Sequence, residues 1–230
     1  MPGRARVDHL VIAARTLEEG VAWCEATLGV VPGPGGAHPL MGTHNRLMKI
    51  ASASFPRAYL EIIAIAPGVK PARSAAKRRW FDLDDATLQA SLARGGPRLV
   101  HFVAEVPDAQ AALQALGQVR IDRGHVIEAS RDTPAGRLAW QITVRDDGQR
   151  LFYGALPTLI QWGPVHPSDS LADSGVSLRS LDLAHPRPPD LDAALRAIGL
   201  SEVSLTGGAP DLHAVLDTPR GTVSLHSRGI

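Results

Sequence analysis

Four side chains of metal-ligand type stand alone in the middle of four apolar stretches. They are His9 in "VDHLV", Glu61 in "YLEII", His101 in "LVHFV" and Gln161 in "TLIQW". Imidazole nitrogen and carboxylate oxygen suit Zn, Ni, Mn or Fe, and two His with one Glu is the composition of an iron facial triad. A single His or Glu in a strand is more often a hydrogen-bonded structural group. The chemistry therefore depends on whether the four side chains meet.

Strand alternation predicts that they do meet, because successive side chains point to opposite faces. One parity holds the apolar set Leu10, Ile12, Leu60, Ile62, Val100, Phe102, Ile160 and Trp162, which we expect to pack under helices. The opposite parity holds His9, Glu61, His101 and Gln161. We expect these four to converge on one polar site, where Glu61 is the group that can transfer a proton.

Three repeated segments indicate the elements that position these residues. Each has an apolar strand, a polar or proline break, a helix and a glycine, at 7–30, 99–119 and 178–200. Further apolar strands follow each helix. We predict an α+β fold of two paired βαβββ modules, at 7–65 and 98–163, joined by a connector at 66–97 that contains a helix over 84–93. A truncated third βαββ unit is predicted at 176–228, all within one domain over 1–230.

The helix starts carry recognisable caps. Thr16 followed by Glu19 is a capping box, and Gly29 is a typical residue after a helix end. Asp108 and Asp190 are the expected N-caps of the helices in the second and third units.

Composition excludes several classes of protein. The 24 Lys+Arg and 23 Asp+Glu give a net charge of +1, which implies no general attraction to nucleic acid or an anionic membrane. The single Cys24 excludes an intramolecular disulfide and a cysteine-cluster metal site, and it lies on an apolar helix face. No signal-peptide-like start and no stretch of roughly 20 apolar residues is present. We expect a cytoplasmic protein.

The pattern resembles the vicinal oxygen chelate superfamily and, more narrowly, the glyoxalase-like domain proteins. The resemblance rests on "VDHLVIAARTLEEGVAWCEATLGV", "GGAHPLMGTHNRLMKI", "YLEIIAIAPG", "RRWFDLD" and "GPRLVHFVAEV". It covers residues 7 to 163, and the third unit fits the extended form of the family.

The resemblance implies metal ligands on the first and last strand of each module. These positions are His9, Glu61, His101 and Gln161; glyoxalase I types usually carry a glutamate at the last of them. A divalent metal would then hold a small substrate through neighbouring oxygens for isomerase or lyase chemistry. Two alternatives stay open: an Fe(II) extradiol-type dioxygenase, and a metal-free binding protein of the bleomycin-resistance type.

Weaker candidates surround this predicted site. His44, Asn45 and Tyr59 are candidate pocket residues, although a solvated glycine-rich loop explains the first two as well. Trp80 and Phe81 are expected to anchor the connector over the pocket. The edge of the third unit is a candidate homodimer surface.

Overall fold

The structure is a computed structural model that describes residues 4–74, 76–133 and 136–229. Its strands are β1 (Arg6–Ala13), β2 (Gly33–His38), β3 (Thr43–Lys49), β4 (Tyr59–Ile65), β5 (Arg98–Glu105), β6 (His125–Thr133), β7 (Gly136–Val144), β8 (Thr158–Trp162), β9 (Ser177–His185), β10 (Ser204–Gly207), β11 (Asp211–Thr218) and β12 (Gly221–His226). Its helices are α1 (Leu17–Leu28), α2 (Ala86–Gly95), α3 (Ala109–Gln118) and α4 (Pro188–Ala197), with 3-10 turns η1 (Phe152–Gly154) and η2 (Pro167–Asp169).

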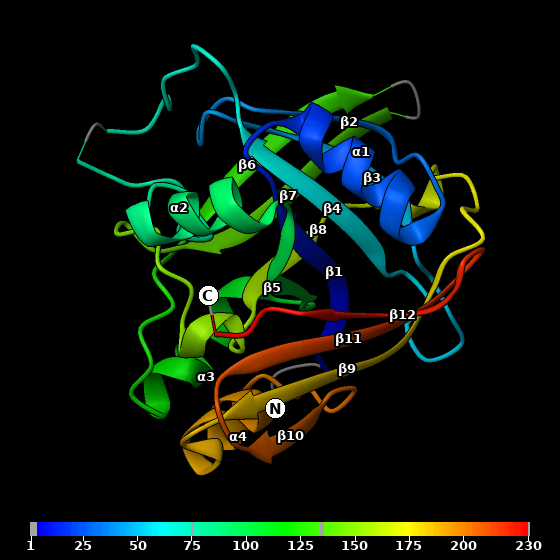
Figure 1. The fold of residues 1–230 in the computed structure, drawn as a ribbon. Coiled ribbons are helices and arrows are strands. Elements are labelled where there is room, and N and C mark those ends of the chain that lie inside the picture. Colours follow the sequence, from blue (N-terminus) through cyan, green and yellow to red (C-terminus); the bar gives the residue numbers. More distant parts are fainter. Residues whose placement is uncertain (1–3, 75, 134–135, 230) are drawn as a thin grey trace.

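Eight strands form one curled sheet in the order β2-β3-β4-β1-β5-β8-β7-β6 (Figure 1). In each half the last strand pairs in parallel with the first, β4 with β1 and β8 with β5. The two first strands, β1 and β5, pair antiparallel at the centre of the sheet. The prediction of two paired βαβββ modules is confirmed.

A second sheet, with the order β10-β9-β11-β12, is built by the third unit. It contains the predicted strand, helix and two strands as β9, α4, β11 and β12. It also contains β10, a strand that the sequence analysis did not predict, which pairs in parallel with β9. Because β10 has only four residues and is largely exposed, its sequence carries no clear alternation of apolar and polar residues.

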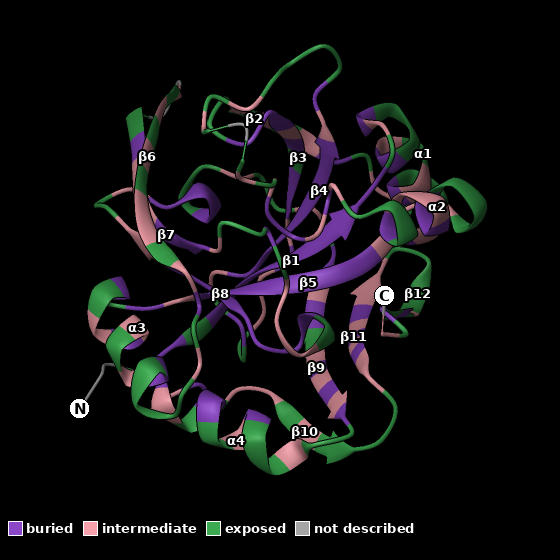
Figure 2. Ribbon diagram, turned by 90° about the vertical axis from the view of Figure 1, so that its left-hand side faces the viewer, coloured by how far each residue is buried: buried purple, intermediate pink, exposed green. Residues whose placement is uncertain are grey.

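The large sheet is covered on both faces. The helix face packs against α1, α3, α4 and the second sheet. The opposite face, here called the site face, packs against the connector and α2, through Trp80, Phe81, Leu83, Leu88 and Leu92. Figure 2 shows β1 and β5 buried along nearly their whole lengths, whereas the outer sides of the helices are exposed.

Two irregularities change which side chains share a face. Between β1 and β5 the register shifts once at Asp8 and once at Val100, so each is an extra residue in its strand. The predicted helix-face set is confirmed for Leu10, Ile12, Leu60, Ile62 and Phe102. It is wrong for Val100, Ile160 and Trp162, which pack on the site face.

The predicted caps are present in two of the three helices. Thr16 Oγ1 accepts a hydrogen bond from the Glu19 amide at 3.1 Å, and Asp108 Oδ1 accepts one from the Ala111 amide at 2.8 Å. Asp190 does not cap α4; it lies in the first turn, and Arg187 is the N-cap residue. The start of α4 is set by its two leading prolines, whose fixed φ suits a first helical turn.

One apolar core joins the two sheets, since it runs from α1 and β1 through β5 to β9 and β11. Cys24 is buried in this core, as predicted. The assignment of residues 1–230 to one domain stays a prediction. Across the described ranges, the helices are too short and too polar for any of them to cross a membrane.

Candidate functional site

His9 and Glu61 lie side by side on the site face. β1 and β4 are parallel neighbours, and their register sets Val11 opposite Glu61 and His9 opposite Tyr59. Nε2 of His9 is 3.6 Å from Oε2 of Glu61, and both side chains are buried. The Tyr59 ring stacks on the imidazole with a centroid distance of 4.5 Å. The first half of the predicted site is therefore assembled by β1 and β4.

Asp8 brings a second carboxylate against His9, because the bulge at this residue turns it toward the site face. Its Oδ1 is 2.5 Å from Nδ1 of His9. Its Oδ2 accepts hydrogen bonds from Nε2 of His166 at 2.8 Å and from Nε1 of Trp162 at 2.9 Å. Burial alone would raise the pKa of Asp8, but the hydrogen bonds from His166 and His9 hold it well below its usual range.

His9 is an imidazolium between two carboxylates. Burial acts to lower its pKa, but hydrogen bonds and charges from Asp8 and Glu61 outweigh burial and raise the pKa to about 9. Burial likewise acts to raise the pKa of Glu61, and the interaction with His9 lowers it below its ordinary value. At neutral pH the three residues therefore carry two negative charges and one positive charge.

A hydrogen-bonded chain orients the Glu61 carboxylate. Oε1 accepts a hydrogen bond from Nδ2 of Asn45 at 2.6 Å. Oδ1 of Asn45 accepts one from the Gly36 amide at 2.7 Å, which fixes the amide group. Oε2 is left as the oxygen that faces His9.

His101 lies in the other half of the sheet and is engaged with different partners. Its Nδ1 donates to the Gly154 carbonyl at 2.9 Å, and its Nε2 accepts a hydrogen bond from the Thr158 amide at 3.1 Å. Nη2 of the buried Arg123 is 3.5 Å from the same Nε2. Burial and the Arg123 charge hold the pKa of His101 well below its usual value, so the ring is neutral.

The structural counterpart of Glu61 is Thr158. In the first module, the residue two positions after His9 pairs with Glu61. In the second module, Val103, two positions after His101, pairs with Thr158. The two modules therefore carry a His–Glu pair and a His–Thr pair at equivalent places.

Gln161 lies on the opposite face of β8 from Thr158, because three positions along a strand reverse the direction of the side chain. Its Oε1 accepts a hydrogen bond from the Ala109 amide at 2.9 Å, at the start of α3. The expected convergence of four side chains is corrected accordingly. The structure unites His9 and Glu61, holds His101 in a separate hydrogen-bond network, and places Gln161 at a helix start.

These residues do not fit a divalent metal ion. Within the described ranges, His9, Glu61 and His101 do not form a cluster of ligand atoms at metal-binding separation. Both ring nitrogens of His101 are engaged, and the guanidinium of Arg123 beside it repels a cation. His9 and Glu61 alone supply two ligands, fewer than protein metal sites use.

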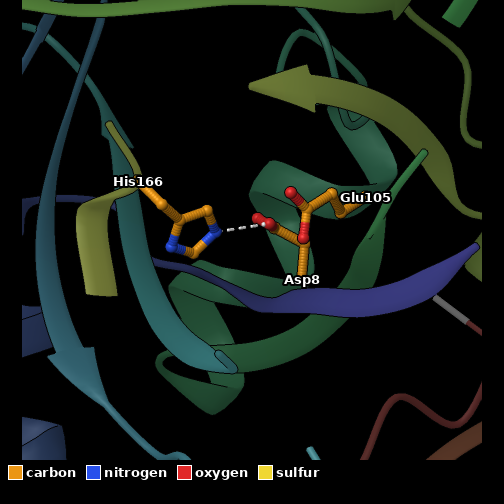
Figure 3. Close-up of side chains that lie close together, drawn as sticks. All are labelled: Asp8, Glu105 and His166. Carbon is orange, nitrogen blue, oxygen red and sulfur yellow. Dashed lines mark hydrogen bonds and ion pairs between the residues drawn. The ribbon is translucent and has the colours of Figure 1, made fainter. Parts of the chain in front are cut away.

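The group in the described residues that does bring three ligand atoms within 4.8 Å of one another is Asp8, Glu105 and His166 (Figure 3). The Ser168 amide donates to Nδ1 of His166 at 3.1 Å, and Nε2 of the ring donates to Asp8 Oδ2 at 2.8 Å, so both ring nitrogens are engaged. That imidazole has no lone pair left for an ion. Burial, with the Asp8 charge, raises the pKa of Glu105.

A small cavity of about 40 Å³ adjoins His9 and Glu61, and a larger pocket of about 620 Å³ lies beside it. The two share the lining residues His38, Trp80, Trp140, Ile142 and Trp162. The two cavities are therefore neighbours with aromatic walls in common, and Glu61 lines the smaller one.

The weaker sequence candidates divide between the two faces of the sheet. Asn45 and Tyr59 line the small cavity, and so does Trp80 of the connector. His44 lines neither cavity, because it alternates with Asn45 along β3 and points to the helix face.

The sequence patterns did not indicate Asp8, Trp162 and His166, nor Arg131, which lines the small cavity. Regular alternation sends Asp8 to the helix face, and a bulge leaves no mark in a single sequence. His166 lies in a loop, where side-chain direction has no period. The adjacent carboxylate–imidazole pair "DH" was the available signal for Asp8.

Two βαβββ modules that pair through their first strands, with a polar site on the face away from the helices, define the vicinal oxygen chelate class. The chain belongs to the glyoxalase-like domain family, whose sequence pattern matches residues 7–199.

Three solved structures are similar to the chain at low sequence identity. A hypothetical protein from Staphylococcus aureus is 14% identical with a TM-score of 0.59, over 96% of this chain and 85% of that chain. A variant methylmalonyl-CoA epimerase from Streptomyces coelicolor, in complex with 2-nitronate-propionyl-CoA, is 18% identical with a TM-score of 0.43, over 71% and 99%. The epimerase from Mycobacterium tuberculosis is 15% identical with a TM-score of 0.37, over 70% and 88%. No curated protein matches the chain.

Proposed function

We propose that the protein binds a small carbonyl-bearing molecule with an apolar or aromatic body and moves a proton on it, in isomerase- or lyase-type chemistry. The single observation that carries this proposal is the shared lining of the 620 Å³ pocket and the Glu61 cavity. A pocket of this size suits a small ligand, and its Trp140 and Trp162 walls favour apolar or aromatic groups.

Glu61 is the proposed proton acceptor. It is ionised, it is buried, and Asn45 binds one oxygen while the other lies 3.6 Å from Nε2 of His9. A positioned carboxylate of this kind contributes to proton transfer when the substrate C–H or O–H lies within hydrogen-bond reach. The His9 imidazolium compensates the negative charge of Glu61 and holds the carboxylate in place.

Hydrogen–deuterium exchange tests this function. The probe is 2-hydroxyacetophenone, whose C–H next to the carbonyl exchanges slowly in D₂O and is followed by proton NMR. We expect the protein to accelerate the exchange and Glu61→Gln to reduce the acceleration at least ~100-fold, while binding persists. Quenching of tryptophan fluorescence measures that binding.

A pocket-filling substitution supplies the matched control. Ala139 lines the large pocket, whereas Ala193 is exposed on α4. Ala139→Trp is expected to abolish binding and exchange, and Ala193→Trp to leave both unchanged. Exchange that survives Ala139→Trp would show that this pocket is not the site.

A metal-free binding protein is the second candidate. The observation in its favour is that His9 is bonded on both sides by carboxylates and needs no ion to satisfy its ring. Binding of 2-hydroxyacetophenone that EDTA leaves unchanged, without any exchange, would select this candidate over the enzyme.

The Zn, Ni, Mn or Fe ion that the sequence analysis predicted has its own test. Elemental analysis of untagged protein is expected to find less than ~0.1 equivalent of transition metal per chain. A true protein metal site would instead hold about one equivalent. A stoichiometric ion that is lost in His9→Ala would restore the metal hypothesis.

A further inference from the structure

Two buried hydrogen-bond donors, on side chains that line the small cavity, have no partner among the described residues. They are Nε1 of Trp80 and Nη1 of Arg131, and both atoms are buried. Trp80 is 7% exposed, and both side chains line the same cavity as Glu61. Buried donors in native proteins are nearly always paired. Two unpaired donors beside a carboxylate therefore indicate an acceptor that the protein chain itself does not supply.

The position of Arg131 depends on a glycine. A Cβ atom at Gly36 would lie 1.6 Å from Nη1 of Arg131, so only glycine leaves room for the guanidinium there. The Gly36 amide also donates to Asn45, which in turn donates to Glu61. The same residue of β2 thus helps to place both the cation and the carboxylate.

The position of Trp80 is fixed by the two connector residues that follow it, Phe81 and Asp82. Phe81 and Asp82, which follow it, both have positive φ, of 59° and 57°. Nε of Arg150 donates to Asp82 at 2.9 Å, and the Trp80 ring stacks on Phe81 at 5.2 Å. A strained backbone persists where the surroundings fix it, as at sites that must be set before a ligand arrives.

The charges at the cavity select the ligand group. Asp8 and Glu61 are negative, and His9 and Arg131 are positive, so the group is neutral as it stands. A neutral carbonyl can enter without adding charge. A carboxylate or phosphate would add an unbalanced negative charge next to Glu61.

We propose that Trp80 Nε1–H and Arg131 Nη1–H form an oxyanion site for the enolate of a ketone- or aldehyde-type substrate that has a C–H next to its carbonyl. The inference rests on the proposed function and names its substrate class. The C–H bond breaks and its proton goes to Oε2 of Glu61. The C–H electron pair forms a C=C bond, and the carbonyl π pair moves onto oxygen, between the two donors. Return of a proton from Glu61 to the same carbon restores the carbonyl, with the hydrogen exchanged.

This step moves one negative charge from Glu61 to the substrate oxygen. The net charge of the cavity and the bound substrate together does not change. Preorganised donors aimed at such an oxygen are among the strongest contributions to catalysis. A guanidinium and an indole N–H would do here what a Lewis-acidic metal does in other enolising sites.

A spectroscopic probe tests the site without relying on turnover. 4-Nitrophenol carries an acidic oxygen on an aromatic ring, and its phenolate absorbs visible light. In Glu61→Gln, which mimics protonated Glu61, we expect bound 4-nitrophenol to be ionised at a pH where the free phenol is not. Adding Trp80→Phe or Arg131→Met is expected to reduce the ionised fraction at least ~10-fold, with EDTA present throughout.

Two further variants separate donor loss from misfolding. Gly36→Ala keeps both donors but displaces the guanidinium, and we expect it to lower phenolate binding as Arg131→Met does. Trp23→Phe removes an indole N–H on α1, far from the cavity, and is expected to change nothing.

The outcomes distinguish this inference from the proposed function. If exchange of 2-hydroxyacetophenone requires Glu61 but neither exchange nor phenolate ionisation responds to Trp80→Phe, Arg131→Met and Gly36→Ala, the oxyanion site is overturned and the function stands. If neither probe binds the pocket, the proposed function fails, and the oxyanion site with it.

Discussion

At the scale of single residues, the unit that defines the site is a histidine between two carboxylates, built from adjacent positions on β1 and one position on β4. The sequence pattern indicated the His9–Glu61 half of this unit but not the Asp8 half. Alternation correctly placed His9 with Glu61, because β1 and β4 are regular and parallel at that point. It placed Asp8 on the wrong face, because the bulge adds one residue.

Because of the buried charges of this unit, we expect the free energy of unfolding to fall as the pH becomes alkaline. A group whose pKa rises on folding stabilises the fold below its unfolded pKa and loses that contribution as pH passes its folded value. For His9 the window runs from 6.5 to about 9. We expect the free energy of unfolding, measured in urea, to fall by a few kcal/mol between pH 7 and pH 10.

Asp8→Asn is the variant that isolates this effect. It removes one carboxylate, so the pKa of His9 rises less and the loss between pH 7 and pH 10 should shrink. The variant should also be less stable than the parent at pH 7. An alkaline loss of equal size in both proteins would assign the effect to other groups.

At the scale of elements, the decisive feature is the register of β8. The sequence analysis matched "TLIQW" to "YLEII" by apolar pattern, which aligns Gln161 with Glu61. Strand pairing aligns Thr158 instead. A pattern of apolar residues cannot detect a shift of three positions when the strand is apolar on both faces.

Gln161 is accordingly expected to stabilise the start of α3, where it accepts a hydrogen bond from the Ala109 amide. Gln161→Leu leaves the Ala109 amide without its acceptor and should lower the free energy of unfolding by about 1 kcal/mol. Gln161 also lines the 620 Å³ pocket, so proton exchange on 2-hydroxyacetophenone should change only through binding, with the step at Glu61 unaltered. Thermal or urea unfolding, with the NMR exchange assay, measures both quantities.

Asp108→Ala is the matched comparison, because it removes the neighbouring cap of the same helix and is expected to cost about 1 kcal/mol. Loss of exchange in Gln161→Leu at unchanged stability would return Gln161 to the active site. That result would mean that Gln161, as the apolar pattern suggested, and not Thr158 is the functional counterpart of Glu61.

At the scale of the whole molecule, the sequence predicted the two paired modules and the third unit, since helix caps and apolar runs are local signals. It did not predict β10, although it expected Trp80 and Phe81 to anchor the connector over the pocket, where both line the small cavity. The connector and α2 cover the site face beside His101, where Phe81 lies 5.3 Å from the imidazole. Packing between segments distant in sequence has no local signature, and it is this packing that limits the polar cavity to the His9 half.

The shared core predicts that both sheets unfold together. Leu216 of β11 is fully buried in that core, and Leu216→Ala should lower the free energy of unfolding by about 2–5 kcal/mol. Val215, its half-buried neighbour on the opposite side of β11, is the control. Val215→Ala should lower the free energy of unfolding by less than Leu216→Ala does. Circular dichroism and tryptophan fluorescence should report one transition at the same urea concentration.

Two separate transitions would show instead that the third unit is a domain of its own. Light scattering on the same samples would measure the oligomeric state. The homodimer expected from the sheet edge of the third unit stays a prediction until then.

The central place of β1 also has a consequence for how the chain is made. β1 leaves the ribosome before its two neighbours, β4 and β5, and His9 pairs with Val103, which emerges much later. Until β4 and β5 have been synthesised, the backbone N–H and C=O groups on both edges of β1 have no strand to pair with. Pairings of such separation close slowly. The nascent chain therefore passes through a stage in which a central strand of its sheet is unpaired, and chaperone demand should peak before β5 has left the exit tunnel.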